Sequence, residues 1–193
     1  MSEGDADAVD GIAEDWRRER PDLEVSALAT VGRLAFVAEN VIGPVGERAV
    51  GRHGIGKGDF DVLATLRRTG APYALSPSAL SAELMMSRAG MTKRLDRLEK
   101  AGLVERALDT GDRRSFRITL TAEGRRVADA ALTDLAASLS VLVSGLTDTE
   151  RHGLDRALHA LLRAGRDLSH EKTEGSGPVS PCAGRNVRGG GPG

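Results

Sequence analysis

The chain has 193 residues, of which 40% are hydrophobic and 3% aromatic, and its formal net charge is −1. This length suffices for one domain with a substantial core plus tails. No uninterrupted apolar run of about 18 residues occurs, so we expect no membrane span. The acidic N-terminus lacks an apolar segment, so we expect no secretory signal. We therefore expect a cytoplasmic protein. The single cysteine, Cys182, excludes a disulfide framework within the chain.

Residues 1–24 are expected to form an acidic N-terminal extension. They contain nine Asp or Glu and three Arg, a net charge of −6, so DNA would repel them. Within them, Val9–Glu19 can form a short helix that ends before Pro21. This helix carries Trp16, the only tryptophan of the chain. On composition alone, a packing anchor is the simplest interpretation of Trp16.

Residues 25–52 are expected to form a helix with a broad apolar stripe. The stripe consists of residues at helical spacing, namely Leu28, Val31, Leu34, Ala35, Ala38, Val41, Ile42 and Val45. Gly43-Pro44 interrupts it, and because proline removes a backbone hydrogen bond, we expect a kink or break near residue 43. The stripe is wide for one helix of a small domain, which fits burial against a second subunit.

Residues 51–58, GRHGIGKG, come close to a phosphate-binding loop because they contain G-x4-G-K. They lack the Ser or Thr that would hold magnesium, and no strand is predicted before them. We therefore favour a glycine-rich loop between helices over a nucleotide site.

Two short helices are predicted after this loop. The first carries Phe60, Val62, Leu63 and Leu66 and stops at Gly70 and Pro72. The second is capped by Ser76 or Ser78 and runs through Leu84, and Ser87 begins a further helix. The gap of about three residues is typical of a helix-turn-helix.

The stretch from Ser87 to Thr121 predicts an amphipathic helix followed by a two-stranded wing. Met91, Leu95 and Leu98 share one face of the helix, and Gly102 lies past its end. Small, hydroxyl and cationic side chains occupy the outward face, where they can enter a major groove. Arg94 lies at the flank of the apolar face and should point sideways into the protein. The expected DNA contacts on this helix are Ser87, Arg88, Ala89, Thr92, Lys93 and Arg97.

The predicted wing pairs Val104–Leu108 with Phe116–Leu120 across a polar loop. Arg113 and Arg114 in this loop are expected to hold an adjacent groove or its phosphates. Residues 88–117 contain nine Lys or Arg and five Asp or Glu, a local charge of +4 in a chain of −1. The plainer alternative is a solvated charged helix and an ordinary hairpin loop.

Two more helices are predicted after the wing. One extends from Thr121 to about Ser144 and the next from Thr147 to about residue 167. With the 25–52 helix they are expected to form a dimerisation lobe, so that a twofold homodimer reads a pseudo-palindromic site. His152 and His159 lie on one helix face as expected surface residues rather than metal ligands, and residues 168–193 should be disordered.

The run GLVERALDTGDRRSFRITLTAEG resembles the wing signature of the MarR family of winged helix-turn-helix regulators. The residues that carry the resemblance are Asp112, Arg113, Arg114, Leu120, Thr121 and Gly124. The family's order of elements extends from about Val25 to Arg166. The resemblance implies a mainly α fold with a small β wing, a DNA-binding lobe over about residues 58–120, dimerisation helices over about 25–52 and 121–167, and no cofactor.

The helix-turn-helix neighbourhood and the segment WRRERPDLE resemble the urate-responsive, UrtR/PecS-like branch of that family. The branch's ligand-site residues fall by motif on Trp16, Asp61, Arg94 and Arg106. The resemblance implies an Asp61–Arg94 ion pair that an anionic purine would disturb while stacking on Trp16. Alternatively, this pair is an ordinary structural salt bridge and Arg106 a phosphate contact.

These observations favour a homodimeric DNA-binding regulator, a repressor released from its operator by a small anionic effector such as urate or a related purine. A regulator of the same fold that answers a phenolic acid or an antibiotic remains an alternative. So do a DNA-organising protein without an effector and a small enzyme using the glycine loop.

Overall fold

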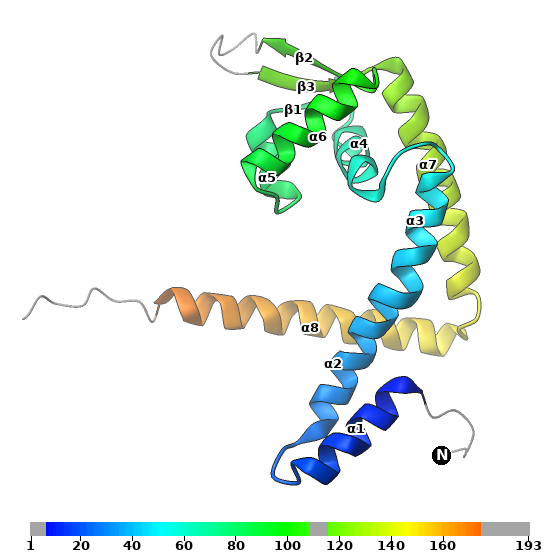
Figure 1. Cartoon of the computed structure of the whole chain (residues 1–193), viewed down its shortest axis with the longest axis vertical. Helices are drawn as coiled ribbons and strands as arrows, with labels where there is room; N and C mark the ends of the chain where they lie inside the picture. The colour runs from blue at the N-terminus through cyan, green and yellow to red at the C-terminus, as the bar shows by residue number, and fades with distance from the viewer. Residues whose placement is uncertain (1–6, 109–115, 175–193) are drawn as a thin grey trace, which may run out of the picture. The chain divides into compact units, whose positions relative to one another are not determined.

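The computed structural model describes residues 7–108 and 116–174, with side chains described up to residue 168 (Figure 1). It divides into two units, residues 1–144 and 145–193. The first unit contains, in chain order, α1 (Ala8–Glu19), α2 (Val25–Val37), a π-helical turn η1 (Ala38–Ile42), α3 (Gly43–Gly51), α4 (Lys57–Arg68), β1 (Ala74–Leu75), α5 (Pro77–Glu83), α6 (Arg88–Lys100), β2 (Val104–Leu108), β3 (Phe116–Leu120) and α7 (Ala122–Val143). The second unit contains α8 (Asp148–Glu174). The predicted mainly α fold with a small β wing is confirmed.

The predicted N-terminal helix is present as α1, which packs against α2. Asp7 caps it by accepting hydrogen bonds from the backbone N–H groups of Val9 and Asp10. Arg33 of α2 ties the two helices together, because its Nε donates to Asp7 Oδ2 at 2.5 Å and its Nη2 to Asp10 Oδ1 at 2.7 Å. The acidic extension is thus partly neutralised by the chain itself.

The interruption predicted at Gly43-Pro44 takes the form of a π-helical turn. In η1 the Gly43 N–H donates to the Ala38 carbonyl, five residues earlier, and Pro44 then lies in the first turn of α3. Widening the helix just before Pro44 accommodates the missing donor without ending the helix. The apolar segment from residue 25 to 51 therefore stays helical throughout, and Figure 1 shows it as one long rod.

This long helix leaves most of its apolar side chains exposed. Leu28 and Val31 are 55% and 56% exposed, and only Val25 of α2 is buried. By length and composition alone the segment Val25–Gly51, which contains an 18-residue window with a mean hydropathy of 1.4, could cross a membrane. The core helix of a soluble protein can have the same length and composition but is mostly buried, whereas only 6% of this apolar window is buried in the single chain. The expectation of no membrane span came from the absence of an uninterrupted apolar run of about 18 residues.

The wing belongs to a three-stranded sheet rather than the expected two-stranded one. The strand order is β1-β3-β2, and both pairs are antiparallel. Val104 lies opposite Leu120 in one pair, and Ala74 lies opposite Thr119 in the other. The loop between α4 and α5 is therefore joined by hydrogen bonds to the strand that leads out of the wing.

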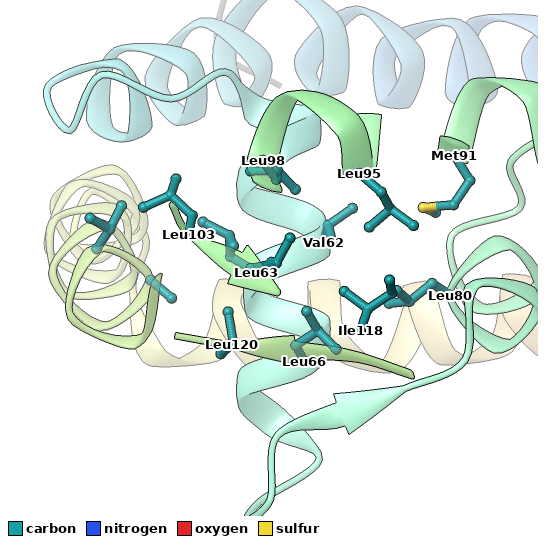
Figure 2. Packing of buried hydrophobic residues seen from close by; sticks show 13 residues of the cluster. Val62, Leu63, Leu66, Leu80, Met91, Leu95, Leu98, Leu103, Ile118 and Leu120 are labelled. Atoms are coloured by element: carbon teal, nitrogen blue, oxygen red, sulfur yellow. The ribbon is translucent and has the colours of Figure 1, made fainter. Parts of the chain in front are cut away.

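One hydrophobic core joins the helix-turn-helix to the sheet and α7. Figure 2 shows α4 contributing Leu63 and Leu66, with Leu95 and Leu98 of α6 above them and Ile118 of β3 alongside. Each of these five side chains is at most 2% exposed. The core thus fixes α6 on α4 and on the sheet, with the opposite face of α6 left toward solvent.

Close packing at Gly124 connects this core to α7. A Cβ at Gly124 would lie 1.8 Å from the Leu103 carbonyl oxygen, so only glycine lets α7 approach so closely. Thr121 caps α7 by accepting a hydrogen bond from the Gly124 N–H at 2.9 Å.

In the second unit, α8 extends to Glu174 instead of ending near residue 167 as expected, and its Leu161 and Leu162 are exposed.

Candidate nucleic-acid interface

The helix-turn-helix is built by α5, a short turn and α6. Ser76 and Ser87 cap the two helices, each accepting a hydrogen bond from a backbone N–H three residues on. Between them Met85 has a φ of 49° and a side chain that is 93% exposed. This turn ends α5 and allows α6 to begin in a new direction, as a helix-turn-helix requires.

The faces of α6 lie as the spacing predicts. Met91, Leu95 and Leu98 are buried, whereas the expected groove residues are exposed, namely Ser87, Arg88, Ala89, Thr92, Lys93 and Arg97. The Thr92 hydroxyl donates to the Arg88 carbonyl at 3.0 Å, so the oxygen of this exposed side chain can still accept a hydrogen bond. Such a threonine can accept from a base amino group or contact a thymine methyl.

Arg97 is exposed and is also held by α4. Its Nε and Nη2 donate to the two carboxylate oxygens of Asp59 at 2.9 and 2.5 Å. The Arg97 side chain is 55% exposed and that of Asp59 only 10%. The hydrogen bond to Asp59 and then the negative charge of that carboxylate raise the pKa of the Arg97 guanidinium. Asp59 was not among the residues that the sequence singled out.

Arg94 points into the protein, as its place at the flank of the apolar face predicts. Its side chain is 25% exposed, and a Cβ at Gly58 would lie 1.9 Å from its Nη1, so the guanidinium rests directly on the glycine backbone. The expected Asp61 partner is wrong for this structure. The Arg94 Nε lies 3.9 Å from Asp59 Oδ1, while Asp61 pairs with Lys57 at 3.3 Å. Asp59 faces α6 because it lies two residues earlier, on a different side of α4.

Arg106 connects the wing to α6, the second helix of the helix-turn-helix, here called the recognition helix. Its Nη2 donates to Asp96, and its Nε lies 3.3 Å from Glu99 Oε2, so both partners are carboxylates of α6. The Arg106 side chain is 30% exposed. Two groups of ion pairs therefore hold α6. In one, a carboxylate of α4 binds arginines of α6, and in the other, an arginine of β2 binds carboxylates of α6.

Trp16 lies apart from these arginines. It lines an apolar cavity of about 280 Å³ between α1 and α2, together with Ile12, Leu28 and Phe36, and no described residue lining that cavity is charged. Figure 1 shows α1 and α6 at opposite ends of the α2–α3 rod. Within a single chain, Arg94 of α6 and Arg106 of β2 therefore both lie at α6, whereas Trp16 does not lie near them.

A groove beside the recognition helix was not predicted. Its volume is about 390 Å³, and it lies between α5, α6 and β3, with Ser76, Ser78, Arg88, Thr92 and Phe116 along it. The serine and arginine side chains give it hydrogen-bond donors on the same face as the exposed residues of α6.

The predicted wing arginines Arg113 and Arg114 lie outside the described residues, as does Cys182.

The glycine loop shows no feature of a nucleotide site in the part of the chain described. It connects α3 to α4 with no strand before it, and Gly56 serves as the N-cap residue of α4. Among the described residues, no group of three or more His, Cys, Asp or Glu is placed to hold a metal ion. The rings of His152 and His159 each contact a backbone carbonyl of their own helix.

Comparisons with known proteins agree with this geometry. Residues 53–115 match the sequence model of the MarR family. The HTH-type transcriptional regulator PecS of Dickeya dadantii (strain 3937) is 39% identical over 150 residues, which cover 78% of this chain and 89% of PecS. The transcriptional repressor MprA of Escherichia coli (strain K12) is 34% identical over 109 residues, 56% of this chain and 61% of MprA.

A crystal structure of a mutant MarR from E. coli complexed with operator DNA superposes with a TM-score of 0.61. The match covers 76% of this chain and 97% of that protein, at 22% sequence identity. This likeness concerns the fold, whereas the extended sequence match to PecS concerns common descent.

Proposed function

Because this chain belongs to the MarR family of winged helix-turn-helix transcriptional regulators, we propose that it is a dimeric cytoplasmic repressor released from a pseudo-palindromic operator by a small anionic ligand such as urate or a related purine. The observation that carries the proposal is that the arginines of α6 lie on two different faces of the helix. Arg88 and Arg97 are exposed on the outward face, whereas Arg94 is turned toward α4. Membership of a family of regulators also removes the alternative of a small enzyme.

In this proposal α6 enters the major groove. Ala89, Thr92, Lys93 and Arg97 face base edges or phosphates, and Ser87 and Arg88 meet phosphate at the helix N-terminus, where backbone N–H groups favour an anion. Ser87 supports this role because its oxygen accepts the Gly90 N–H while its own hydrogen stays available to a phosphate. Arg113 and Arg114 are proposed to hold the neighbouring groove.

The exposed apolar surface supports a homodimer. Leu28, Val31 and Leu34 of α2 are 40% to 56% exposed, and α8 separately exposes Leu161 and Leu162. Apolar surface on this scale is costly in water and is typical of a subunit interface. A twofold dimer would present one α6 to each half-site of an operator.

The effector is proposed to act on the ion pairs that hold α6. Arg94 and Arg106 are cations on or beside this helix, and both are partly buried against carboxylates. An anionic ligand that binds these arginines must compete with Asp59, Asp96 and Glu99, and would repel Asp61. Because a ligand shifts an equilibrium only by its differential affinity, the DNA-competent and released states must differ in these pairs. Trp16 is retained as a proposed stacking residue that a change in α1 would have to bring closer.

The test is a gel-shift titration on a duplex enriched from a random library by the purified protein, at fixed salt, with and without urate. Fixed salt is needed because the phosphate contribution varies steeply with ionic strength. We expect specific binding that urate releases. Specific binding that is indifferent to urate would reject the purine and keep the regulator, and salicylate as a phenolic acid would be the next ligand to titrate.

Arg94→Ala locates the ligand site. We expect it to retain operator binding within about threefold and to lose most of the urate response, because Arg94 does not face the groove. Arg67→Ala is the matched control, since Arg67 is another cation of the lobe and pairs with Asp129 of α7 at 2.7 Å. A normal urate response in Arg94→Ala would contradict the proposed site.

A further inference from the structure

The carboxylate of Asp59 is built into the DNA-binding lobe as an anion. Its side chain is 10% exposed, and it accepts both hydrogen bonds from Arg97, with the Nε of Arg94 at 3.9 Å. Asp59 also lies in the first turn of α4, where the helix dipole stabilises negative charge. The carboxylate of Asp59 is therefore held in a fixed position against the arginines of α6.

Arg97 has guanidinium N–H groups that its ion pair with Asp59 does not use. A guanidinium has five N–H donors, and Asp59 occupies one on Nε and one on Nη2. The Arg97 side chain remains 55% exposed, one helical turn from Lys93 on the outward face of α6. The remaining N–H groups are therefore fixed in direction and open to solvent.

We propose that Asp59 is a positioning residue for DNA recognition, which orients Arg97 so that its remaining N–H groups meet a phosphate or a guanine edge of the operator. This inference rests on the proposed DNA-binding function. It adds a residue that acts on DNA binding without itself contacting the DNA. A free arginine side chain loses much rotamer freedom when it is immobilised, and an arginine already held in a bidentate pair loses less. The pair thus favours binding by ordering Arg97 in advance.

The opposite role, in which Asp59 competes with DNA for Arg97, is disfavoured by burial. If Arg97 left for a phosphate, Asp59 would be a largely buried carboxylate with only Arg94 nearby, at a distance beyond a hydrogen bond. Leaving a buried charge without its partner is strongly unfavourable. The pair should therefore persist when DNA binds.

The experiment is a double-mutant cycle in operator binding at fixed salt. The probe is the duplex enriched from a random library by the wild-type protein, and a scrambled duplex reports non-specific binding. The proteins are the wild type, Asp59→Asn, Arg97→Gln and the double variant. We expect Asp59→Asn to weaken specific binding about five- to tenfold in the wild type and by less than about twofold in the Arg97→Gln background. Binding to the scrambled duplex should change by less than about twofold where Arg97 meets a guanine edge, and by about the same factor as specific binding where it meets a phosphate, because phosphate contacts carry no sequence information.

Three further variants keep the result interpretable. Arg97→Lys retains the charge but cannot form the bidentate pair, so it should lose about as much specific affinity as Asp59→Asn. Asp129→Asn removes a carboxylate of α7, the partner of Arg67 in α4, and should leave operator affinity unchanged. Thermal unfolding of each variant shows whether the fold is retained, and Arg97→Lys remains informative if Asp59→Asn is unstable. Arg97→Ala, which removes the guanidinium and also most of the side chain, should bind at least as weakly as Arg97→Gln.

Two results would overturn the inference. Tighter operator binding by Asp59→Asn would show that Asp59 competes with DNA, and an equal loss in both Arg97 backgrounds would show that Asp59 only supports the packing of α4 and α6. Failure of the wild type to enrich any duplex is a separate outcome, which would reject the proposed DNA-binding function before the cycle begins.

Discussion

Leu63 shows how strongly single side chains of the core hold the recognition helix. It is fully buried among α4, α6 and the sheet (Figure 2). Leu63→Ala should lower the free energy of unfolding by about 2–5 kcal/mol, because it loses the transfer free energy of the removed atoms and leaves a cavity. Urea denaturation followed by circular dichroism measures this loss.

Met85→Ala is the control for that substitution. Met85 is 93% exposed, so its truncation should change the free energy of unfolding by no more than about 0.5 kcal/mol. Equal losses in both variants would contradict the placement of the core between α4 and α6.

Asp59 and Asp61 show what the sequence could and could not predict at this scale. The inward direction of Arg94 followed from its angle on α6, because periodicity alone determines which face of a helix a residue occupies. Its partner depended on how α4 crosses α6, and neither helix's own periodicity contains that crossing. Two acids in the segment GDFDVL were available, and the structure places Asp59 rather than Asp61 against the arginines.

Among the elements, the α1–α2 pair should respond to acid. The hydrogen bond from Arg33 lowers the pKa of the Asp7 carboxyl. A lowered folded-state pKa gives stability that is present above the unfolded pKa and is lost as the pH falls through the folded value. Docking of α1 should therefore weaken at a pH below about 4. Trp16 fluorescence follows the change, because Trp16 lies between the two helices.

Arg33→Gln tests the origin of that transition. It removes the partner of Asp7 and Asp10, so the Trp16 emission at neutral pH should already be shifted and should vary less with acid. An acid transition unchanged from the wild type would contradict the role of this ion pair in docking α1.

The elements that the sequence predicted best are those with long periodic patterns. The helices from residue 25 onward followed from apolar spacing, and the caps at Ser87 and Thr121 from their sequence positions. The cap of α5 was predicted as Ser76 or Ser78, and the structure shows that it is Ser76. β1 was missed because two residues carry no period, and its pairing with β3 bridges more than forty residues of sequence. The π-helical turn was predicted only as a break, because proline shows that a hydrogen bond is lost but not how the helix adapts.

At the scale of the whole molecule, the exposed stripe of α2 predicts an obligate partner. Val31→Asp places a charge on a residue that is 56% exposed in the single chain and is proposed to be buried in the dimer. We expect monomers in sedimentation experiments and at least about a tenfold loss of operator affinity, because two linked recognition helices bind more tightly than one.

Ser26→Asp is the matched control, since it adds the same charge in the first turn of α2, where the helix dipole tolerates it. A dimeric Val31→Asp variant would contradict the assignment of this stripe to the subunit interface. The stripe itself was predicted from the sequence, and the structure adds that a single chain leaves it largely uncovered.

The strand order β1-β3-β2 also bears on how the protein behaves at high concentration. A small sheet has two edges whose free backbone groups can recruit strands of other molecules and so start aggregation. One edge here is β1, which has only two residues, and the other is β2, which carries Glu105 and Arg106. A very short edge strand and charged side chains are both devices that oppose such recruitment. The sheet can therefore support a DNA-binding wing in the crowded cell without itself becoming a template for fibrous assembly.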